Sequence, residues 1–233
     1  MVVSYAIGDI HGRDALLEQM HARIVHDPYR KKDAPKPTVV HLGDYIDGGP
    51  ESHKVIDRVM RGSDAFKTVA LLGNHEALML ECLETDDRDV WWNWLNNGGD
   101  RTLEAFGIPF RMNGFNPRTL GEALGEERVD WLRSLPLHHI VDDYLFVHAG
   151  IAPGIPLEGQ QAKDMLWIRA RFLDSDVDHG YTIVHGHTQT VEPEVKKNRI
   201  GIDTGAARPR TLTAVALDDR KPPRFISVSE SRF

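Results

Sequence analysis

The feature that most constrains the fold is a repeated ending of apolar segments. Five short runs rich in β-branched and apolar residues each lead into Asp, Asn or His with a glycine beside it. The endings are Gly-Asp-Ile-His-Gly after residues 2–7, Gly-Asp after 38–42, Gly-Asn-His-Glu after 68–72, His-Ala-Gly after 144–147 and His-Gly-His after 182–184. Runs of this kind predict β-strands. Because ligands of α/β proteins gather beyond the carboxyl ends of strands, the pattern predicts one shared polar site.

Helical patterns alternate with these strands. Apolar residues recur at helical spacing over three segments, 14–25, 52–60 and 75–83. This alternation through the first 85 residues predicts an α/β core. Two later apolar runs predict further strands, at 199–202 and 211–217. Residues 86–135 break the rhythm with three tryptophans and a glycine pair, so we predict a mostly helical insertion there, within a single domain spanning 1–233.

The polar residues at the strand ends form a plausible set of metal ligands, namely Asp9, His11, Asp44, Asn74, His148 and His187. Carboxylate, imidazole and amide groups without a thiolate suit Mn²⁺, Zn²⁺ or Fe. Six ligands exceed one tetrahedral site and fit two ions bridged by a carboxylate. The plainer interpretation is that a Gly-Asp after a strand is only a turn. Five such endings in one chain favour a metal centre.

Composition narrows the class of protein. The 233 residues carry a formal net charge of −7, which argues against a broad nucleic-acid-binding face. No apolar stretch is long enough to span a bilayer, so no membrane partner is expected. The single cysteine, Cys82, cannot form an intrachain disulfide, and no signal peptide is evident; both favour a cytoplasmic location.

Other conspicuous residues are interpreted as structural. The three tryptophans, Trp91, Trp92 and Trp94, are expected to pack as the core of the insertion. Several histidines in polar or helical contexts are expected to be ordinary surface or core residues: His21, His26, His53, His138, His139 and His179. His185 precedes His187 by two residues, so it is a candidate for supporting that ligand from the same face.

In chain order, the motifs at the strand ends are Gly-Asp-Ile-His-Gly, Gly-Asp-Tyr-Ile-Asp-Gly-Gly, Leu-Gly-Asn-His-Glu, His-Ala-Gly and His-Gly-His-Thr. This series resembles the phosphoprotein phosphatase (PPP) family of calcineurin-like metallophosphoesterases. That family includes Ser/Thr protein phosphatases and bacterial symmetrical diadenosine tetraphosphate hydrolases. The likeness runs from residue 6 to about 217. The stretches Trp-Ile-Arg-Ala-Arg-Phe and Gly-Ile-Asp-Thr-Gly-Ala also resemble bacterial members.

The resemblance implies a fold and a role for each motif residue. The fold is two packed mixed β-sheets flanked by helices, with the site at one end. Asp9 and His11 would bind the first metal and Asp44 would bridge both. The second metal would take Asn74, His148 and His187. His75 would be the general acid, oriented by Asp47.

The chemistry implied by these residue types is phosphoester hydrolysis. Two divalent ions, with Mn²⁺ expected and Fe or Zn as alternatives, would acidify a bridging water. The resulting hydroxide would attack phosphorus in line, while His75 protonates the departing oxygen. Asn74 and Arg169 would contact the substrate phosphate.

The sequence departs from the family at its phosphate-binding arginines. The family usually has Arg at the position of Gly48 and protein phosphatases tend to have Arg at that of Leu72, whereas Arg169 matches. Arg binds phosphate oxygens bidentately, so a dianionic monoester would be held less strongly here. Gly48 would then make room for a larger or less charged substrate. The alternative is that another arginine replaces the missing one, the candidates being Arg101, Arg111, Arg118 and Arg208.

Three functions are therefore compared. The leading hypothesis is a dinuclear-metal phosphatase acting on phosphate monoesters, including phosphoserine and phosphothreonine in a phosphoprotein. The alternative is a dinucleoside polyphosphate hydrolase or phosphodiesterase acting on a nucleotide, with the tryptophan-rich insertion covering a base. A non-catalytic binding protein is disfavoured because every metal ligand is present together with His75 and Asp47.

Overall fold

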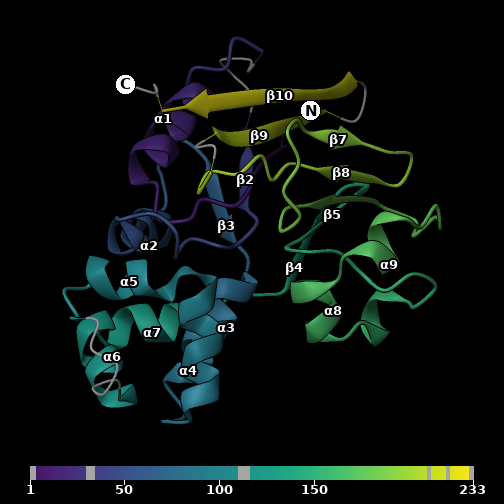
Figure 1. The fold of residues 1–233 in the computed structure, drawn as a ribbon. Coiled ribbons are helices and arrows are strands. Elements are labelled where there is room, and N and C mark those ends of the chain that lie inside the picture. The colour runs from purple at the N-terminus through teal and green to yellow at the C-terminus, as the bar shows by residue number, and fades with distance from the viewer. Residues whose placement is uncertain (1–3, 30–34, 110–115, 209–210, 219–220, 231–233) are drawn as a thin grey trace.

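The computed structural model describes residues 4–29, 35–109, 116–208, 211–218 and 221–230. Within these residues, two five-stranded mixed sheets stack on one another, with helices on their outer faces (Figure 1). No helix among the described residues is long and apolar enough to cross a membrane.

The first sheet contains the strands that precede the first three polar motifs. Its order is β10 (Lys221–Ser229), β9 (Thr211–Asp218), β1 (Ser4–Ile7), β2 (Thr38–His41) and β3 (Lys67–Ala70). Strands β1, β2 and β3 run parallel, so their carboxyl ends lie at one edge of the sheet. Strand β9 pairs antiparallel with both β1 and β10.

The second sheet contains the strands that precede the last two motifs. Its order is β4 (His138–Val141), β5 (Tyr144–Val147), β6 (Thr182–His185), β8 (Arg199–Gly201) and β7 (Glu194–Val195). Strands β5, β6 and β8 are parallel, whereas the edge strands β4 and β7 are antiparallel to their neighbours.

Alternation along the strands divides the core into layers. In β1, Tyr5 and Ile7 belong to the cluster on the helix side, whereas Ala6 packs with residues of the other sheet such as Phe146 and Val184. Successive strand side chains point to opposite faces, so one strand supplies both layers. This double burial explains why the strands read as apolar runs rather than as alternating patterns.

Helices cover both outer faces. On the first sheet lie α1 (Asp14–Val25), α2 (Ser52–Arg61) and α3 (Asn74–Cys82). On the second lie the 3₁₀ helix Leu157–Gly159 and the short helices α8 (Ala162–Trp167) and α9 (Ala170–Leu173) (Figure 1).

The segment predicted as an insertion is helical where it is described. It contains α4 (Arg88–Trp94), a π-helical turn (Leu95–Gly99), α5 (Asp100–Ala105), α6 (Pro117–Leu124) and α7 (Glu126–Arg133). It packs against helices α2 and α3 rather than directly on a sheet edge (Figure 1). Trp91 and Trp94 join the main core cluster, while Trp92 is exposed.

The predicted fold class, two packed mixed sheets flanked by helices, is confirmed. The helix predicted over 14–25 has those bounds in the structure. Three strands were not predicted, namely β4, β7 and β10. The prediction that His138 and His139 lie in polar or helical segments was wrong, because both belong to strand β4, which pairs with β5. Residues 2 and 3 of the first predicted strand lie outside the described residues.

Candidate metal centre and active site

The five polar strand ends converge where the two sheets meet. Parallel strands β1, β2 and β3 deliver Asp9, Asp44 and Asn74 from the first sheet. Parallel strands β5 and β6 deliver His148 and His187 from the second. Side chains that are 74 and 113 residues apart in sequence therefore touch, because His148 Nε2 lies 2.7 Å and His187 Nδ1 2.8 Å from the same oxygen, Asn74 Oδ1.

One compact group of donors is formed by Asp44, His148 and His187, whose ligand atoms all lie within 4.8 Å of one another. All three residues are buried. His148 Nδ1 is 2.8 Å from the Leu42 carbonyl, to which it donates as the neutral tautomer, leaving Nε2 as a ligand atom. Metal–nitrogen bonds of about 2.1 Å place neighbouring donors about 3 Å apart, which agrees with the contacts to Asn74.

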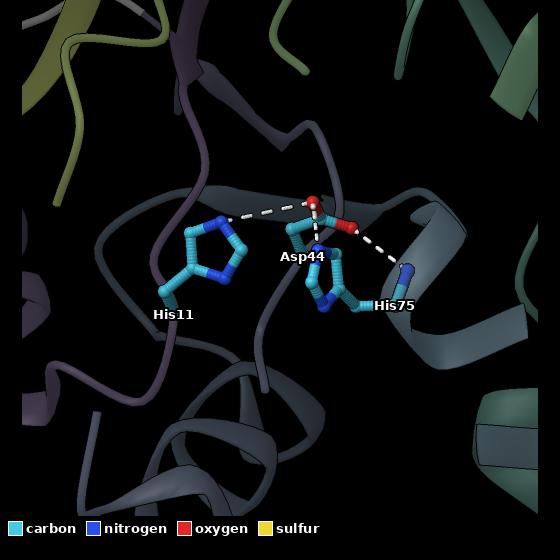
Figure 2. Close-up of side chains that lie close together, drawn as sticks. All are labelled: His11, Asp44 and His75. Atoms are coloured by element: carbon cyan, nitrogen blue, oxygen red, sulfur yellow. Dashed lines mark hydrogen bonds and ion pairs between the residues drawn. The ribbon is translucent and has the colours of Figure 1, made fainter. Parts of the chain in front are cut away.

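A second compact group contains His11, Asp44 and His75 (Figure 2). His11 Nε2 lies 3.8 Å and His75 Nε2 3.7 Å from Asp44 Oδ2, while the His75 amide donates to Asp44 Oδ1 at 3.1 Å. Asp44 belongs to both groups, as a bridging carboxylate must.

Asp9 lies beside these groups but belongs to neither of the two identified among the described residues. Its Oδ2 accepts a hydrogen bond from the His187 amide at 2.9 Å. Within the described chain, its Oδ1 is buried without a hydrogen-bond partner, as is His187 Nε2. A buried carboxylate oxygen without a hydrogen-bond partner is costly unless a cation approaches it, so this donor set fits divalent ions.

The electrostatics of the centre also fit cation binding. Burial raises the pKa of Asp9 well above its usual value, and the neighbouring charges of Asp203 and Asp44 raise it further. For Asp44, burial acts in the same direction, but His148, His75 and His11 outweigh it and hold the pKa below the usual range. Burial lowers the pKa of His187 to about 3, so its imidazole is neutral and able to bind a metal.

The partly buried His75 pairs with the carboxylate predicted to orient it. His75 Nδ1 is 2.7 Å from Asp47 Oδ2, and Asp47 has no exposed surface. Burial lowers the pKa of His75, but Asp44 and the hydrogen bond with Asp47 outweigh this effect and raise it to about 9. The protonated imidazole is thus the favoured form at neutral pH, as a proton donor requires.

Asp47 is itself held by residues that sequence reasoning did not assign to the site. Trp94 Nε1 donates to Asp47 Oδ2 at 3.0 Å, and Thr102 Oγ1 donates to Asp47 Oδ1 at 2.6 Å. Trp94 was predicted only as insertion core; it is buried, but its indole N–H also reaches the site. A buried tryptophan needs a partner for that N–H, and this requirement is a signal that could have indicated a polar contact.

Glu76 is a third residue missing from the predicted site. Its Oε1 accepts from the amides of Tyr45 and Ile46, at 2.8 and 3.2 Å, and its Oε2 from those of Asp44 and Gly73, at 2.9 and 3.1 Å. Burial, followed by the charge of Asp44, raises its pKa to about 8. Glu76 therefore joins the turns after β2 and β3 that carry Asp44 and Asn74.

Backbone strain is concentrated at this centre. Of five non-glycine residues with positive φ in the described chain, four are predicted site residues: His11, Asp44, Asp47 and His187. Left-handed conformations of non-glycine residues are uncommon and cluster at functional sites, where the surrounding structure holds them in place.

His185 lies behind the ligand loop. It is buried, its Nε2 is 3.4 Å from Arg199 Nη1, and Arg199 in turn pairs with Glu194 at 2.7 Å. Burial lowers the pKa of His185 to about 4, so the ring is neutral. The suggested supporting role of His185 stays a prediction.

The predicted phosphate-binding arginine is placed at the rim. Arg169 is exposed and immediately precedes α9, and its charge is one of those that lower the pKa of His187. Among the replacement candidates, Arg101 and Arg118 pair with Glu104 and Glu122 on the surface.

The two other candidate replacement arginines are Arg111 and Arg208. Arg111 lies outside the described residues. Arg208 is exposed and follows Ala207, whose Cβ lies 3.2 Å from the position that a Cβ on Gly48 would take. Arg208 is therefore one residue along the chain from a side chain that adjoins Gly48.

Comparison with known proteins agrees with this geometry. The sequence pattern of the family described as "Calcineurin-like phosphoesterase" matches residues 4–211. The chain belongs to the calcineurin-like phosphoesterase family, which confirms the resemblance seen in the motifs.

Curated relatives carry two kinds of name. Serine/threonine-protein phosphatase 2 of Escherichia coli (strain K12) is 28% identical over 219 residues, which is 87% of each chain. A symmetrical bis(5'-nucleosyl)-tetraphosphatase of Paracidovorax citrulli is 35% identical over 107 residues, covering 39% of this chain. That match spans only 35% of the relative's own length.

Solved structures show the same fold. The crystal structure of a proposed diadenosine tetraphosphatase aligns with a TM-score of 0.68 at 19% identity, covering 100% of this chain and 95% of that one. A protein serine/threonine phosphatase from Saccharomyces cerevisiae aligns with a TM-score of 0.63 at 15% identity, covering 100% and 81%. At such low identity these likenesses support the fold alone.

Proposed function

We propose that this protein is a dinuclear-metal phosphatase that hydrolyses phosphate monoesters, with phosphoserine and phosphothreonine as candidate substrates. The observation that carries the proposal is Asp44, a buried carboxylate shared by two donor groups and adjacent to the His75–Asp47 pair. The comparable coverage of both chains in the match to the Escherichia coli phosphatase supports this choice.

Each residue has a defined task in this proposal. Two divalent cations held at this centre would supply an activated water and neutralise charge on the phosphoryl group. Asp9, His11 and Asp44 would hold the first ion, and Asp44, Asn74, His148 and His187 the second. Mn²⁺ is the proposed ion, because nitrogen and oxygen donors without thiolate accept it.

The chain's own groups would complete the reaction. Asn74 and Arg169 would orient the phosphate by hydrogen bonds. His75 Nδ1 is engaged by Asp47, so Nε2, which faces Asp44, is the nitrogen available to give its proton to the departing oxygen. Asp47 keeps that imidazole protonated and correctly turned.

The lone buried cysteine, Cys82, supports the cytoplasm as the location of the protein.

A second candidate activity is hydrolysis of a dinucleoside polyphosphate. It is favoured by Gly48, because an anhydride phosphorus bears less charge and depends less on the missing arginine. The names of several curated relatives point in the same direction.

The test is a substrate panel with purified protein and Mn²⁺. The substrates are p-nitrophenyl phosphate, bis-p-nitrophenyl phosphate, a phosphopeptide and diadenosine tetraphosphate. Monoester and phosphopeptide turnover is expected to exceed diester turnover, and preference for diadenosine tetraphosphate would select the second candidate. Absence of turnover with Mn²⁺, Fe²⁺, Zn²⁺ and Co²⁺ alike would reject both.

The bridging role is tested by Asp44→Asn. Loss of one bridging charge should lower kcat by more than about 100-fold, whatever the preferred substrate. Asp64→Asn removes the same charge at an exposed position and should retain normal activity. Normal rates in Asp44→Asn would exclude a two-metal mechanism.

A further inference from the structure

Asp203 is a buried carboxylate beside the candidate metal centre; it belongs to the Gly-Ile-Asp-Thr-Gly-Ala stretch, to which no role was assigned above. It follows β8 of the second sheet and is 7% exposed. Its neighbour Ile202 packs directly against Gly8, because a Cβ on Gly8 would lie 2.7 Å from the Ile202 carbonyl oxygen. The segments carrying Asp9 and Asp203 therefore meet where the two sheets close together.

The hydrogen bonding of Asp203 uses only one of its two carboxylate oxygens. Oδ1 accepts from the Gly205 amide at 2.9 Å, which fixes the turn after β8. Oδ2 has no hydrogen-bond or ion-pair partner within the described part of the chain. One oxygen thus anchors the carboxylate, while the other is free to meet a ligand.

Among the described residues, no lysine or arginine forms an ion pair with Asp203. After burial itself, Asp203 is the largest influence raising the pKa of Asp9. Burial also raises the pKa of Asp203, with Asp44 adding to this effect and His11 and His148 opposing it. Neighbouring buried carboxylates are unfavourable together when both are ionised, and either a proton or a bound cation relieves this repulsion.

We propose that Asp203 is a further cation-binding carboxylate of this centre, acting beside Asp9 to attract and hold the divalent ion of the first site. The inference rests on the metal-dependent function proposed above and adds a residue to its binding set. The competing explanation is that Asp203 only shapes the turn through Gly205.

The substitution Asp203→Asn separates these explanations. Asparagine keeps an oxygen that accepts from the Gly205 amide, but it removes the negative charge. Without metal, the melting temperature should rise, because repulsion with Asp9 and Asp44 is relieved. Mn²⁺ affinity, measured by titration calorimetry, should fall roughly 10- to 100-fold, as for other groups that support a metal site. Asp64→Asn, an exposed charge-matched control, should change neither quantity.

The proposal is supported only if Asp203→Asn both raises the melting temperature of the metal-free protein and lowers its Mn²⁺ affinity. A lower melting temperature of the metal-free variant would show that Asp203 is a structural turn residue. Unchanged Mn²⁺ affinity would show that its charge does not act on the metal. Both readouts are independent of turnover, so failure of every substrate in the panel would reject the proposed function without deciding this result.

Discussion

Gly48 lies at a contact between three separate segments of the chain. Its amide donates to the Gly98 carbonyl at 3.4 Å, its φ is +74°, and a Cβ there would contact Ala207 at 3.2 Å and His11 at 3.8 Å. A side chain at this position must therefore accept a left-handed backbone and displace the Ala207 turn. The glycine leaves the phosphate side of the centre without a fixed guanidinium at this position.

Restoring an arginine should change substrate preference. We expect Gly48→Arg combined with Ala207→Gly, which relieves the predicted contact, to raise the monoester-to-diester ratio of kcat/KM roughly ten-fold. The physical reason is one added charge-assisted hydrogen bond to a dianionic phosphate. Steady-state kinetics with the two nitrophenyl substrates measure the ratio. Gly48→Ala is the control for backbone strain, and an unchanged or lower ratio in the arginine variant would contradict the argument.

At the scale of elements, the insertion does more than cover the core. Its helix α4 ends with Trp94 and its helix α5 contains Thr102, and both residues donate hydrogen bonds to Asp47. Asp47 in turn contacts His75, which lies at the start of α3. The position of the candidate proton donor therefore depends on packing between the insertion and α3.

This dependence predicts a non-additive mutant series. Trp94→Phe and Thr102→Val should each lower kcat, because Asp47 loses a hydrogen bond and its fixed orientation. In an Asp47→Asn background, which should itself lose roughly 100-fold or more, neither change should add much. Trp92→Phe, on the same helix but exposed, is the matched control. Full additivity in the kcat values for p-nitrophenyl phosphate would show that Trp94 and Thr102 act elsewhere.

The sequence predicted the strands before the polar motifs but not strand β10. The strands before the polar motifs were predictable because they end at Gly with Asp, Asn or His and because all of them except the partly buried β3 are mostly buried. Strand β10 was not, because Pro222 and Pro223 oppose strand structure; they are tolerated on an edge strand with a register shift between Lys221 and Arg224. The contacts of Trp94 and Thr102 with Asp47 span 47 and 55 residues, and no local pattern specifies them.

At the scale of the whole molecule, acid stability should depend on a histidine pair that is not among the proposed metal ligands. His41 of β2 is buried and its Nε2 lies 2.9 Å from Nε2 of His21 on α1. Burial lowers the pKa of His21 to about 3 and that of His41 to about 4. The unfolded chain takes up protons near its ordinary pKa of 6.5, so this stabilisation is present above that pH and is lost as the pH falls toward the folded values.

Urea unfolding in the presence of EDTA tests this effect. When the pH is lowered from 7.5 to 5.5, protonation of each of these two histidines in the unfolded chain should reduce the free energy of unfolding by about 1 kcal/mol. The double variant His21→Gln/His41→Gln should therefore lose about 2 kcal/mol less than the wild type over this interval. His26→Gln, at an exposed position, should follow the wild type. Parallel pH dependences of the wild type and the double variant would exclude the pair as the source.

The convergence of two sheets on one centre has a kinetic consequence. Asp9 and His187 are separated by 178 residues, and Asn74 and His187 by 113, so the complete donor set exists only after both sheets have docked. A bound ion then acts as a late cross-link between the two halves of the chain. Such a cross-link slows unfolding far more than it speeds folding, because the transition state lacks it. Metal supply would thus set the lifetime of the folded protein rather than the rate at which it is formed.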